Sequence, residues 1–301
     1  MIRTTVPLIL VPVTVTDRHG KGINGLAAAD FEVLDNGDIV KHTLETTVQP
    51  IALVVAVQTS AIAGPSLAKI QKIGAMFDPL VVGEKGVAAI LTYSDQVRVV
   101  QDFTESVDEF TRHMRTLEPD GNSRTEARMN DAVIAAVEML ASRPSFRHIL
   151  VVIGESRDRG SKSKLQEAIT RAQAANLTVY PVNYSVYKTS FTSRGDERFS
   201  SGRRVYDTDP DNLLAVFTEI ARLGQENGSL ALAKYTGGEK LSFTKLSGLE
   251  RIVQRVGEDL HTRYLLSFEA GALESGSYHK ITVNVRRAEA VVRARPGYWV
   301  E

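Results

Sequence analysis

The chain has 301 residues, of which 43% are apolar, and its 36 Lys and Arg side chains balance 36 Asp and Glu side chains. This length and composition are typical of one large or two ordinary globular domains, and the neutral balance provides no global field that would attract nucleic acid. The absence of cysteine excludes disulfides, thiolate metal sites and a cysteine nucleophile.

The start of the chain combines a basic residue with an apolar run, as secretory signal peptides do. However, two prolines interrupt the run, no small-residue cleavage site follows, and Val11, Val13 and Val15 alternate as in a half-buried strand. We therefore interpret the segment as a strand and expect no signal peptide. Further on, Asn36 and Gly37 lie between two alternating runs and predict a β-hairpin.

The middle of the chain has a different pattern, in which short apolar runs alternate with amphipathic segments of helical spacing, such as Leu67, Ile70, Ile73 and Phe77. The apolar runs are residues 51–57, 86–93, 148–154, 177–184 and 240–243. Strands that are apolar on both faces and alternate with helices indicate a parallel sheet covered on both sides. We predict an α/β fold with a Rossmann-like, doubly wound sheet. No apolar run approaches the roughly 20 residues that a membrane span needs.

One pair of strands departs from this alternation, because only Ser94 and Asp95 separate them. Such a short connection makes an antiparallel hairpin, so we expect a mostly parallel sheet with one antiparallel edge strand. The last part of the chain returns to alternating strands. Since isolated hairpins are marginal in water, we predict that residues 1–48 and 263–301 form one small antiparallel β-sandwich, into which an α/β domain of residues 49–262 is inserted.

Several phrases of the sequence, in this order, are family-like: VPVTVTDRHGKGINGLAAADFEVLDNG near the start, then LAKYTGG, DLHTRYLLSFEAG and VRARPGYW near the end. The chain resembles the bacterial VWFA-related proteins, abundant in acidobacteria, in which a von Willebrand factor type A domain lies between β-rich ends. The resemblance covers nearly the whole chain. It implies the type A fold, and it suggests an exported protein, periplasmic or extracellular, although the chain itself shows no leader.

The resemblance also implies a place for a metal-ion-dependent adhesion site, at the rim where the parallel strands end. The family pattern there is Asp-x-Ser-x-Ser after the first strand, a Thr from a later loop and an Asp after the fourth strand. These oxygen ligands suit magnesium or manganese. In this sequence the first motif contains Gln58, Ser60 and Ile62, so one charge and one hydroxyl are lost, while Glu155 matches the later acid.

The threonine position of that pattern is less well defined. Counting back from Asp131 places Ala127 there, whereas Thr125 or Ser123 could serve if the loop is longer. Because a hard cation needs charge and a full oxygen shell to repay its lost waters, we expect a vestigial site at Gln58, Ser60, Ile62, Thr125 and Glu155. The expectation is that no metal or other cofactor is bound, and the alternative is a bound Mg or Mn ion.

Other site chemistry has weaker signals. The sequence has no glycine-rich phosphate loop and no histidine pair at zinc-ligand spacing. Ser60 lies at a strand-to-helix turn, as a hydrolase nucleophile would, but it lacks the flanking glycines of a nucleophile elbow.

A long tract at residues 185–209 is rich in Ser, Arg, Phe and Tyr and has no helical or strand period. Loops of this length are either functional or disordered, and the sequence leaves both open. Aromatic and arginine side chains dominate protein interfaces. The candidate partner-binding residues are Tyr187, Phe191, Arg194, Arg198, Phe199, Arg203, Arg204 and Tyr206.

These observations together predict a non-enzymatic protein-interaction or adhesion module that binds an unknown protein partner through its rim loops without a metal. The first alternative is a Mg- or Mn-dependent adhesion module using Ser60, Thr125 and Glu155. The further alternative is an uncharacterised enzyme at the same rim. We expect no nucleic-acid partner and no membrane span.

Overall fold

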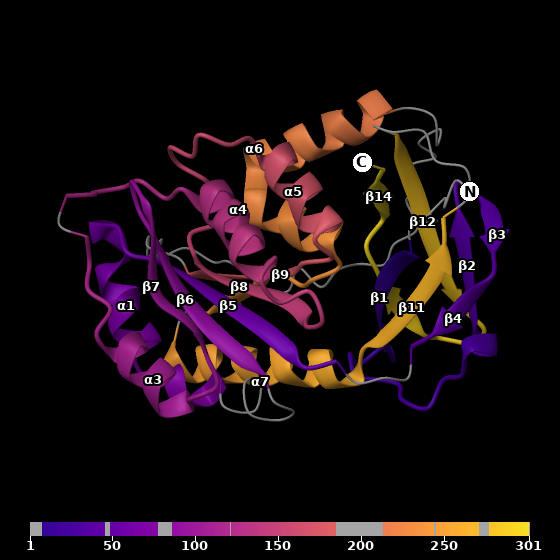
Figure 1. The fold of residues 1–301 in the computed structure, drawn as a ribbon, viewed down its shortest axis with the longest axis horizontal. Coiled ribbons are helices and arrows are strands. Elements are labelled where there is room, and N and C mark those ends of the chain that lie inside the picture. Colours follow the sequence, from indigo (N-terminus) through magenta and orange to yellow (C-terminus); the bar gives the residue numbers. More distant parts are fainter. Residues whose placement is uncertain are drawn as a thin grey trace, which may run out of the picture.

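The computed structural model describes residues 8–45, 49–77, 86–120, 122–184, 213–243, 245–270 and 277–300. An α/β part and a β-rich part lie side by side along the longest axis of the molecule (Figure 1).

The α/β part is built on a six-stranded sheet with the order β10-β9-β8-β5-β6-β7. Its strands are β5 (Ile51–Gln58), β6 (Val87–Tyr93), β7 (Val97–Thr104), β8 (Arg147–Gly154), β9 (Thr178–Tyr184) and β10 (Leu241–Phe243). All neighbouring strands are parallel except β7, which pairs antiparallel with β6. The predicted doubly wound sheet with one reversed edge strand is therefore confirmed, and the apolar runs form its strands because every residue of β5, β6 and β9 is buried.

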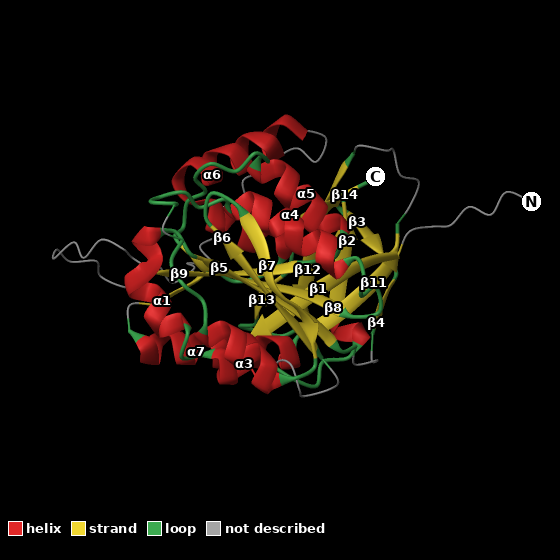
Figure 2. Ribbon diagram, turned by 60° about the vertical axis from the view of Figure 1, so that its left-hand side comes forward, coloured by secondary structure: helices red, strands yellow, loops and turns green. Residues whose placement is uncertain are grey.

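Helices cover both faces of this sheet, as Figure 2 shows from a second direction. One face carries α1 (Gly64–Ile70), α3 (Val107–Arg115) and α7 (Leu246–Thr262). The other carries α4 (Met129–Leu140), α5 (Leu165–Ala174) and α6 (Leu213–Thr236). Helix α6 is interrupted at Asn227, whose backbone is extended. Within the described residues, no helix combines the length and apolarity needed to cross a membrane.

One helix is shorter than its apolar spacing predicts. Leu67, Ile70, Ile73 and Phe77 are all buried, but α1 ends at Ile70, and the chain continues as a turn and a 3-10 helix, Gly74–Phe77. A Cβ at Gly74 would lie 2.9 Å from the Cα of Thr111 in α3. The close approach of α3 thus redirects the segment while its apolar side chains stay in the core.

The β-rich part consists of two four-stranded sheets with the orders β13-β1-β11-β4 and β14-β12-β2-β3. The first contains β1 (Leu8–Thr16), β4 (His42–Leu44), β11 (Tyr264–Glu269) and β13 (Val291–Arg293). The second contains β2 (Phe31–Asp35), β3 (Asp38–Val40), β12 (Tyr278–Val285) and β14 (Gly297–Trp299). Alternate residues of both sheets, such as Val11, Val13 and Val33, meet in one apolar core. Asn36 and Gly37 have positive φ and form the predicted hairpin turn between β2 and β3.

A buried ionic cluster joins the two parts of the molecule. The Asp259 carboxylate, on α7, accepts hydrogen bonds from Thr14 Oγ1 of β1 at 2.7 Å, from Arg293 of β13 at 2.6 Å and from Arg263 at 2.9 Å. The hydroxyl of Tyr180 on β9 donates to the same carboxylate. Asp259 and Arg263 have side chains that are 6% and 1% exposed, so the charges are shielded from water.

Two glycines allow a matched test of this packing. A Cβ on Gly238 would lie 1.8 Å from the carbonyl oxygen of Val179 in β9, whereas one on Gly248 in α7 would meet nothing closer than Phe243 Cβ at 3.5 Å. We expect Gly238→Ala to lower the free energy of unfolding by about 1–3 kcal/mol through overpacking. We expect Gly248→Ala to raise it by about 0.4–1 kcal/mol, because alanine restricts the unfolded chain. Urea denaturation of both variants measures the contrast, and equal effects would contradict the described β9 contact.

Candidate functional site

The candidate site lies at the edge of the sheet where the parallel strands end. Strands β5 and β8 are parallel neighbours in register from Ile51 and Arg147 to Val57 and Ile153. Their following loops therefore begin side by side, and polar residues immediately after the two strands are brought together. Crevices at this edge are the usual ligand sites of open α/β sheets.

Gln58, the last residue of β5, is fully buried and links the two loops. Its Nε2 donates to Ser60 Oγ at 2.8 Å and to Glu155 Oε2 at 3.3 Å. Its Oε1 accepts from the backbone N–H of Glu155 at 2.8 Å and from the hydroxyl of Tyr184 at 3.3 Å. Burial raises the pKa of Tyr184 well above its usual value, so this hydroxyl stays protonated. Both ends of the amide are thus satisfied within the protein.

A cationic side chain of the protein lies against Glu155. Arg159 Nη2 donates to Glu155 Oε2 at 2.6 Å, and the two side chains are 35% and 10% exposed. Arg159 Nη1 also donates to the backbone carbonyl of Thr125 at 3.2 Å, and the Arg159 backbone pairs with Ala127. The Arg159 guanidinium therefore neutralises the Glu155 carboxylate and links the loop after β8 to the loop before α4 by hydrogen bonds.

The structure brings Gln58, Ser60 and Glu155 together as the sequence predicts, and Arg159 links the backbone of Thr125 to Glu155. Thr125 is exposed, and its described contacts use backbone atoms: its carbonyl accepts from Arg159, and its N–H donates to Glu126. Ile62 is half-buried, and its N–H donates to the carbonyl of Arg124 at 3.2 Å. Isoleucine has no hydroxyl at position 62, and none of the described hydrogen bonds uses the hydroxyl of Thr125.

Two polar groups at this rim went unnoticed in the sequence. Arg159 follows Glu155 by four residues with the opposite charge, but this spacing predicts an ion pair on a helix, and the segment is a loop. Asp120 has no such local signal, because its partner Ser94 lies 26 residues away. The Ser94 hydroxyl, donating at 2.8 Å, lowers the pKa of Asp120. The backbone of Asp120 pairs with the loop after β5, next to Ser60.

The chemistry of these groups does not fit a divalent cation. Glu155 is paired with Arg159, Gln58 Oε1 accepts two hydrogen bonds, and Ser60 Oγ accepts one. Hard cations need several oxygen ligands with negative charge. Here the one carboxylate that matches the family pattern, Glu155, is already paired with the Arg159 guanidinium. Across the part of the chain that the structure describes, no group of three or more His, Asp and Glu side chains is arranged to hold a metal.

Ser60 is also poorly arranged as a nucleophile. It is fully buried, and its hydroxyl accepts from the Gln58 amide, which cannot act as a base. The eight candidate partner-binding residues of the tract at 185–209, from Tyr187 to Tyr206, lie outside the described residues.

The rim gives a direct prediction for Gln58. Gln58→Leu keeps the volume but removes every polar atom, so the buried Ser60 hydroxyl and the Glu155 N–H lose their partners. We expect the free energy of unfolding to fall by about 1–3 kcal/mol, the usual cost of leaving buried polar groups unsatisfied. Gln101→Leu on the edge strand β7, where the amide donates to the carbonyl of Asp102 and also contacts the Glu109 carboxylate, should change it by less than about 0.5 kcal/mol. Chemical denaturation measures the free energy of unfolding of both variants. A Gln58→Leu variant as stable as the wild type would contradict the described hydrogen bonds of Gln58.

The sequence and the fold are both similar to those of known proteins. A family model described as von Willebrand factor type A domain matches residues 67–211. A von Willebrand factor type A structure from Catenulispora acidiphila aligns with a TM-score of 0.50 at 10% identity, covering 100% of this chain and 76% of that chain. No protein of curated function matches.

Two further solved structures are similar in fold at low identity. The hypothetical protein BatB from Bacteroides thetaiotaomicron is 12% identical with a TM-score of 0.47, covering 70% of this chain and 99% of that one. The vWF domain of the type V pili tip protein Mfa5 from Porphyromonas gingivalis is 10% identical with a TM-score of 0.47, covering 76% and 99%. Identities this low describe the fold alone.

Proposed function

Because the family model of the von Willebrand factor type A domain matches residues 67–211, we propose that the chain is a non-enzymatic interaction module that binds a protein partner through its rim loops without a metal ion. Domains of this family often mediate protein–protein interaction. Export to the periplasm or the cell exterior, which the family resemblance implies, is part of the same proposal.

The observation that carries the metal-independent part is the Arg159 to Glu155 ion pair. The guanidinium supplies the positive charge that a bound cation would otherwise supply beside Glu155. Its Nη2 lies 2.6 Å from Glu155 Oε2, and its Nη1 donates to the backbone carbonyl of Thr125. A half-buried carboxylate with this partner gains little from a second cation, which would have to displace the arginine and give up its own waters.

The non-enzymatic part is supported by the burial of the polar groups at the rim. Gln58 and Ser60 are fully buried, so neither presents a reactive atom to solvent. What the rim loops expose beside this cluster is a surface with one apolar, one cationic and one polar side chain, Ala61, Arg124 and Thr125. Such a surface is suited to contact with another protein rather than to enclosure of a small substrate.

The experiment is affinity capture with matched surface variants. The immobilised protein should retain a partner from its native source equally well in EDTA and in magnesium. Ala61→Glu places a charge on the exposed rim and should abolish capture. Ala141→Glu, an equally exposed alanine at the far end of α4, should leave it intact. Release of the partner by EDTA, or full capture by Ala61→Glu, would contradict the proposal.

A further inference from the structure

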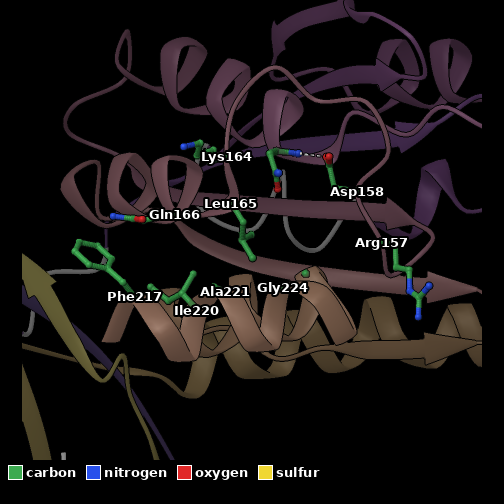
Figure 3. Close-up of a pocket in the computed structure, with 11 residues that line it drawn as sticks. Arg157, Asp158, Lys164, Leu165, Gln166, Phe217, Ile220, Ala221 and Gly224 are labelled. Atoms are coloured by element: carbon green, nitrogen blue, oxygen red, sulfur yellow. Dashed lines mark hydrogen bonds between the residues drawn. The ribbon is translucent and has the colours of Figure 1, made fainter. Parts of the chain in front are cut away.

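A groove separate from the cluster of Gln58, Ser60 and Glu155 runs between the start of α5 and helix α6. It has a volume of about 510 Å³, within the range of about 300–1,000 Å³ that ligand pockets occupy. Its apolar wall is formed by Leu165 of α5 with Phe217, Ile220 and Ala221 of α6 (Figure 3). Gly224 lets the two helices approach, because a Cβ there would lie 2.6 Å from Leu165 Cδ2.

Two cationic side chains border this apolar wall. Arg157 and Lys164 are both exposed, and within the described residues neither contacts a carboxylate. Figure 3 shows them well apart, with Leu165 and Gly224 between them, so a single carboxylate could not reach both. No side chain caps the N-terminus of α5 at Lys164, which adds partial positive charge at that end of the groove.

One acidic residue, Asp158, is also among the lining residues of the groove. The Asp158 carboxylate accepts from the backbone N–H of Asn130 at 2.9 Å and from Ser161 Oγ at 2.5 Å. The carboxylate keeps its negative charge, but its oxygens are directed at these protein donors, so Arg157 and Lys164 are the charged groups left to contact a ligand at the two ends of the groove.

A buried acceptor in the groove lacks a donor. Asn130 lines the groove and is 5% exposed; its Nδ2 donates to the Ser163 carbonyl at 3.3 Å, but its Oδ1 has no hydrogen-bond partner. Buried polar atoms are nearly always paired in native structures. The oxygen is less than 1 Å² exposed, so an N–H group of a ligand in the groove would satisfy it once the Asn130 side chain turns toward the groove.

We propose that the groove binds an extended segment of a protein partner in which an apolar side chain lies between two acidic residues. The apolar side chain packs on Leu165 and Ala221, the acidic residues face Arg157 and Lys164, and a backbone N–H of the segment donates to Asn130 Oδ1. A peptide is the ligand class that carries an N–H, an apolar side chain and spaced carboxylates together. The inference rests on the proposed function in taking the ligand to be a protein.

The test uses three labelled peptides with the cores Asp-Ala-Leu-Ala-Glu, Lys-Ala-Leu-Ala-Lys and Asp-Ala-Ser-Ala-Glu, measured by fluorescence anisotropy at low salt. Only the first should bind the full chain. Arg157→Glu should weaken its binding by about tenfold or more, as expected for loss of a charge-assisted contact. Ala221→Trp, at an exposed helix position, fills the groove and should abolish binding. Circular dichroism verifies that both variants stay folded.

Arg124→Glu is the matched control, because it reverses a charge on the exposed rim outside the groove and should leave binding unchanged. Equal binding of the lysine or serine peptide, unchanged binding by Ala221→Trp, or no binding of any peptide would overturn the proposal. So would displacement of the first peptide by hexanoate at equal affinity, which would indicate a small-molecule site. The Ala61→Glu capture experiment reports on the rim instead, so the two proposals can fail separately.

Discussion

Asp259→Asn is expected to lower the free energy of unfolding by about 3–5 kcal/mol, the usual effect of removing one partner from a buried ionic cluster. The substitution preserves shape but removes the negative charge between Arg263 and Arg293, whose nitrogens lie 2.9 Å and 2.6 Å from the carboxylate. Since Thr14 and Tyr180 donate to the same group, the variant weakens contacts that join α7 and β9 to the β-rich part.

Urea denaturation of the wild type and the variant measures this effect. The control is Glu167→Gln, which breaks an i,i+4 pair with Arg171 in which both side chains are more than 40% exposed. Surface pairs contribute about 0–1 kcal/mol, so the control should change little. An Asp259→Asn variant as stable as the control would show that the cluster does not hold the two parts together.

The same cluster predicts a pH dependence. Burial alone would raise the pKa of Asp259, but Arg263, Arg293 and the two hydroxyl donors hold it well below its usual range. A depressed folded-state pKa contributes stability that is fully present above the unfolded pKa of about 3.9 and is lost as pH falls through the folded value. The stability difference between wild type and Asp259→Asn should therefore be constant near neutral pH and shrink below about pH 4. A difference that grows on acidification would contradict the assigned charge state.

The second large effect is expected for Gln58→Asp combined with Arg159→Ala. This variant places two carboxylates side by side at the ends of β5 and β8 and removes the guanidinium that neutralises Glu155. In EDTA the repulsion should destabilise it by about 2–4 kcal/mol, the scale for like charges about 4 Å apart at an effective dielectric constant near 20. Magnesium or manganese should then restore about 2.7 kcal/mol when present at a hundredfold excess over Kd.

Thermal unfolding with EDTA, magnesium and manganese measures the response of this double variant. Gln58→Asp alone is the control, because Arg159 still neutralises the site and should leave only a weak response to metal. If the single variant responds as strongly as the double variant, Arg159 is not the group that replaces a cation at the rim.

Much of the fold could be predicted from the sequence, because its periodicities are set by burial. Strands apolar on both faces became β5 and β6, and the short connection, predicted as Ser94 and Asp95 and observed as the three residues 94–96, fixed the reversed edge strand β7. Helix α1 was predicted too long, because the neighbour that redirects it at Gly74 is α3, more than 30 residues away. The spacing of apolar residues within one segment does not predict a contact with a helix so distant in the sequence.

The candidate site likewise had features that the sequence predicted and features that depend on contacts between distant segments. The union of Gln58, Ser60 and Glu155 could be predicted, because parallel strand order and motif alignment determine which loops meet. The place of Thr125 depended on a loop length that the sequence left open, and the described contacts of this residue use its backbone. The Asp259 cluster was not predicted, because Thr14 and Arg293 come from opposite ends of the chain. No local sequence pattern indicates that such distant residues are in contact.

The central claim, that the rim acts without a divalent cation because Arg159 already neutralises Glu155, is tested most directly by isothermal titration calorimetry of the wild-type chain with magnesium and with manganese. We predict no binding tighter than millimolar for either ion. Submillimolar binding of either ion that Glu155→Ala abolishes would contradict the claim and establish a metal-dependent adhesion site.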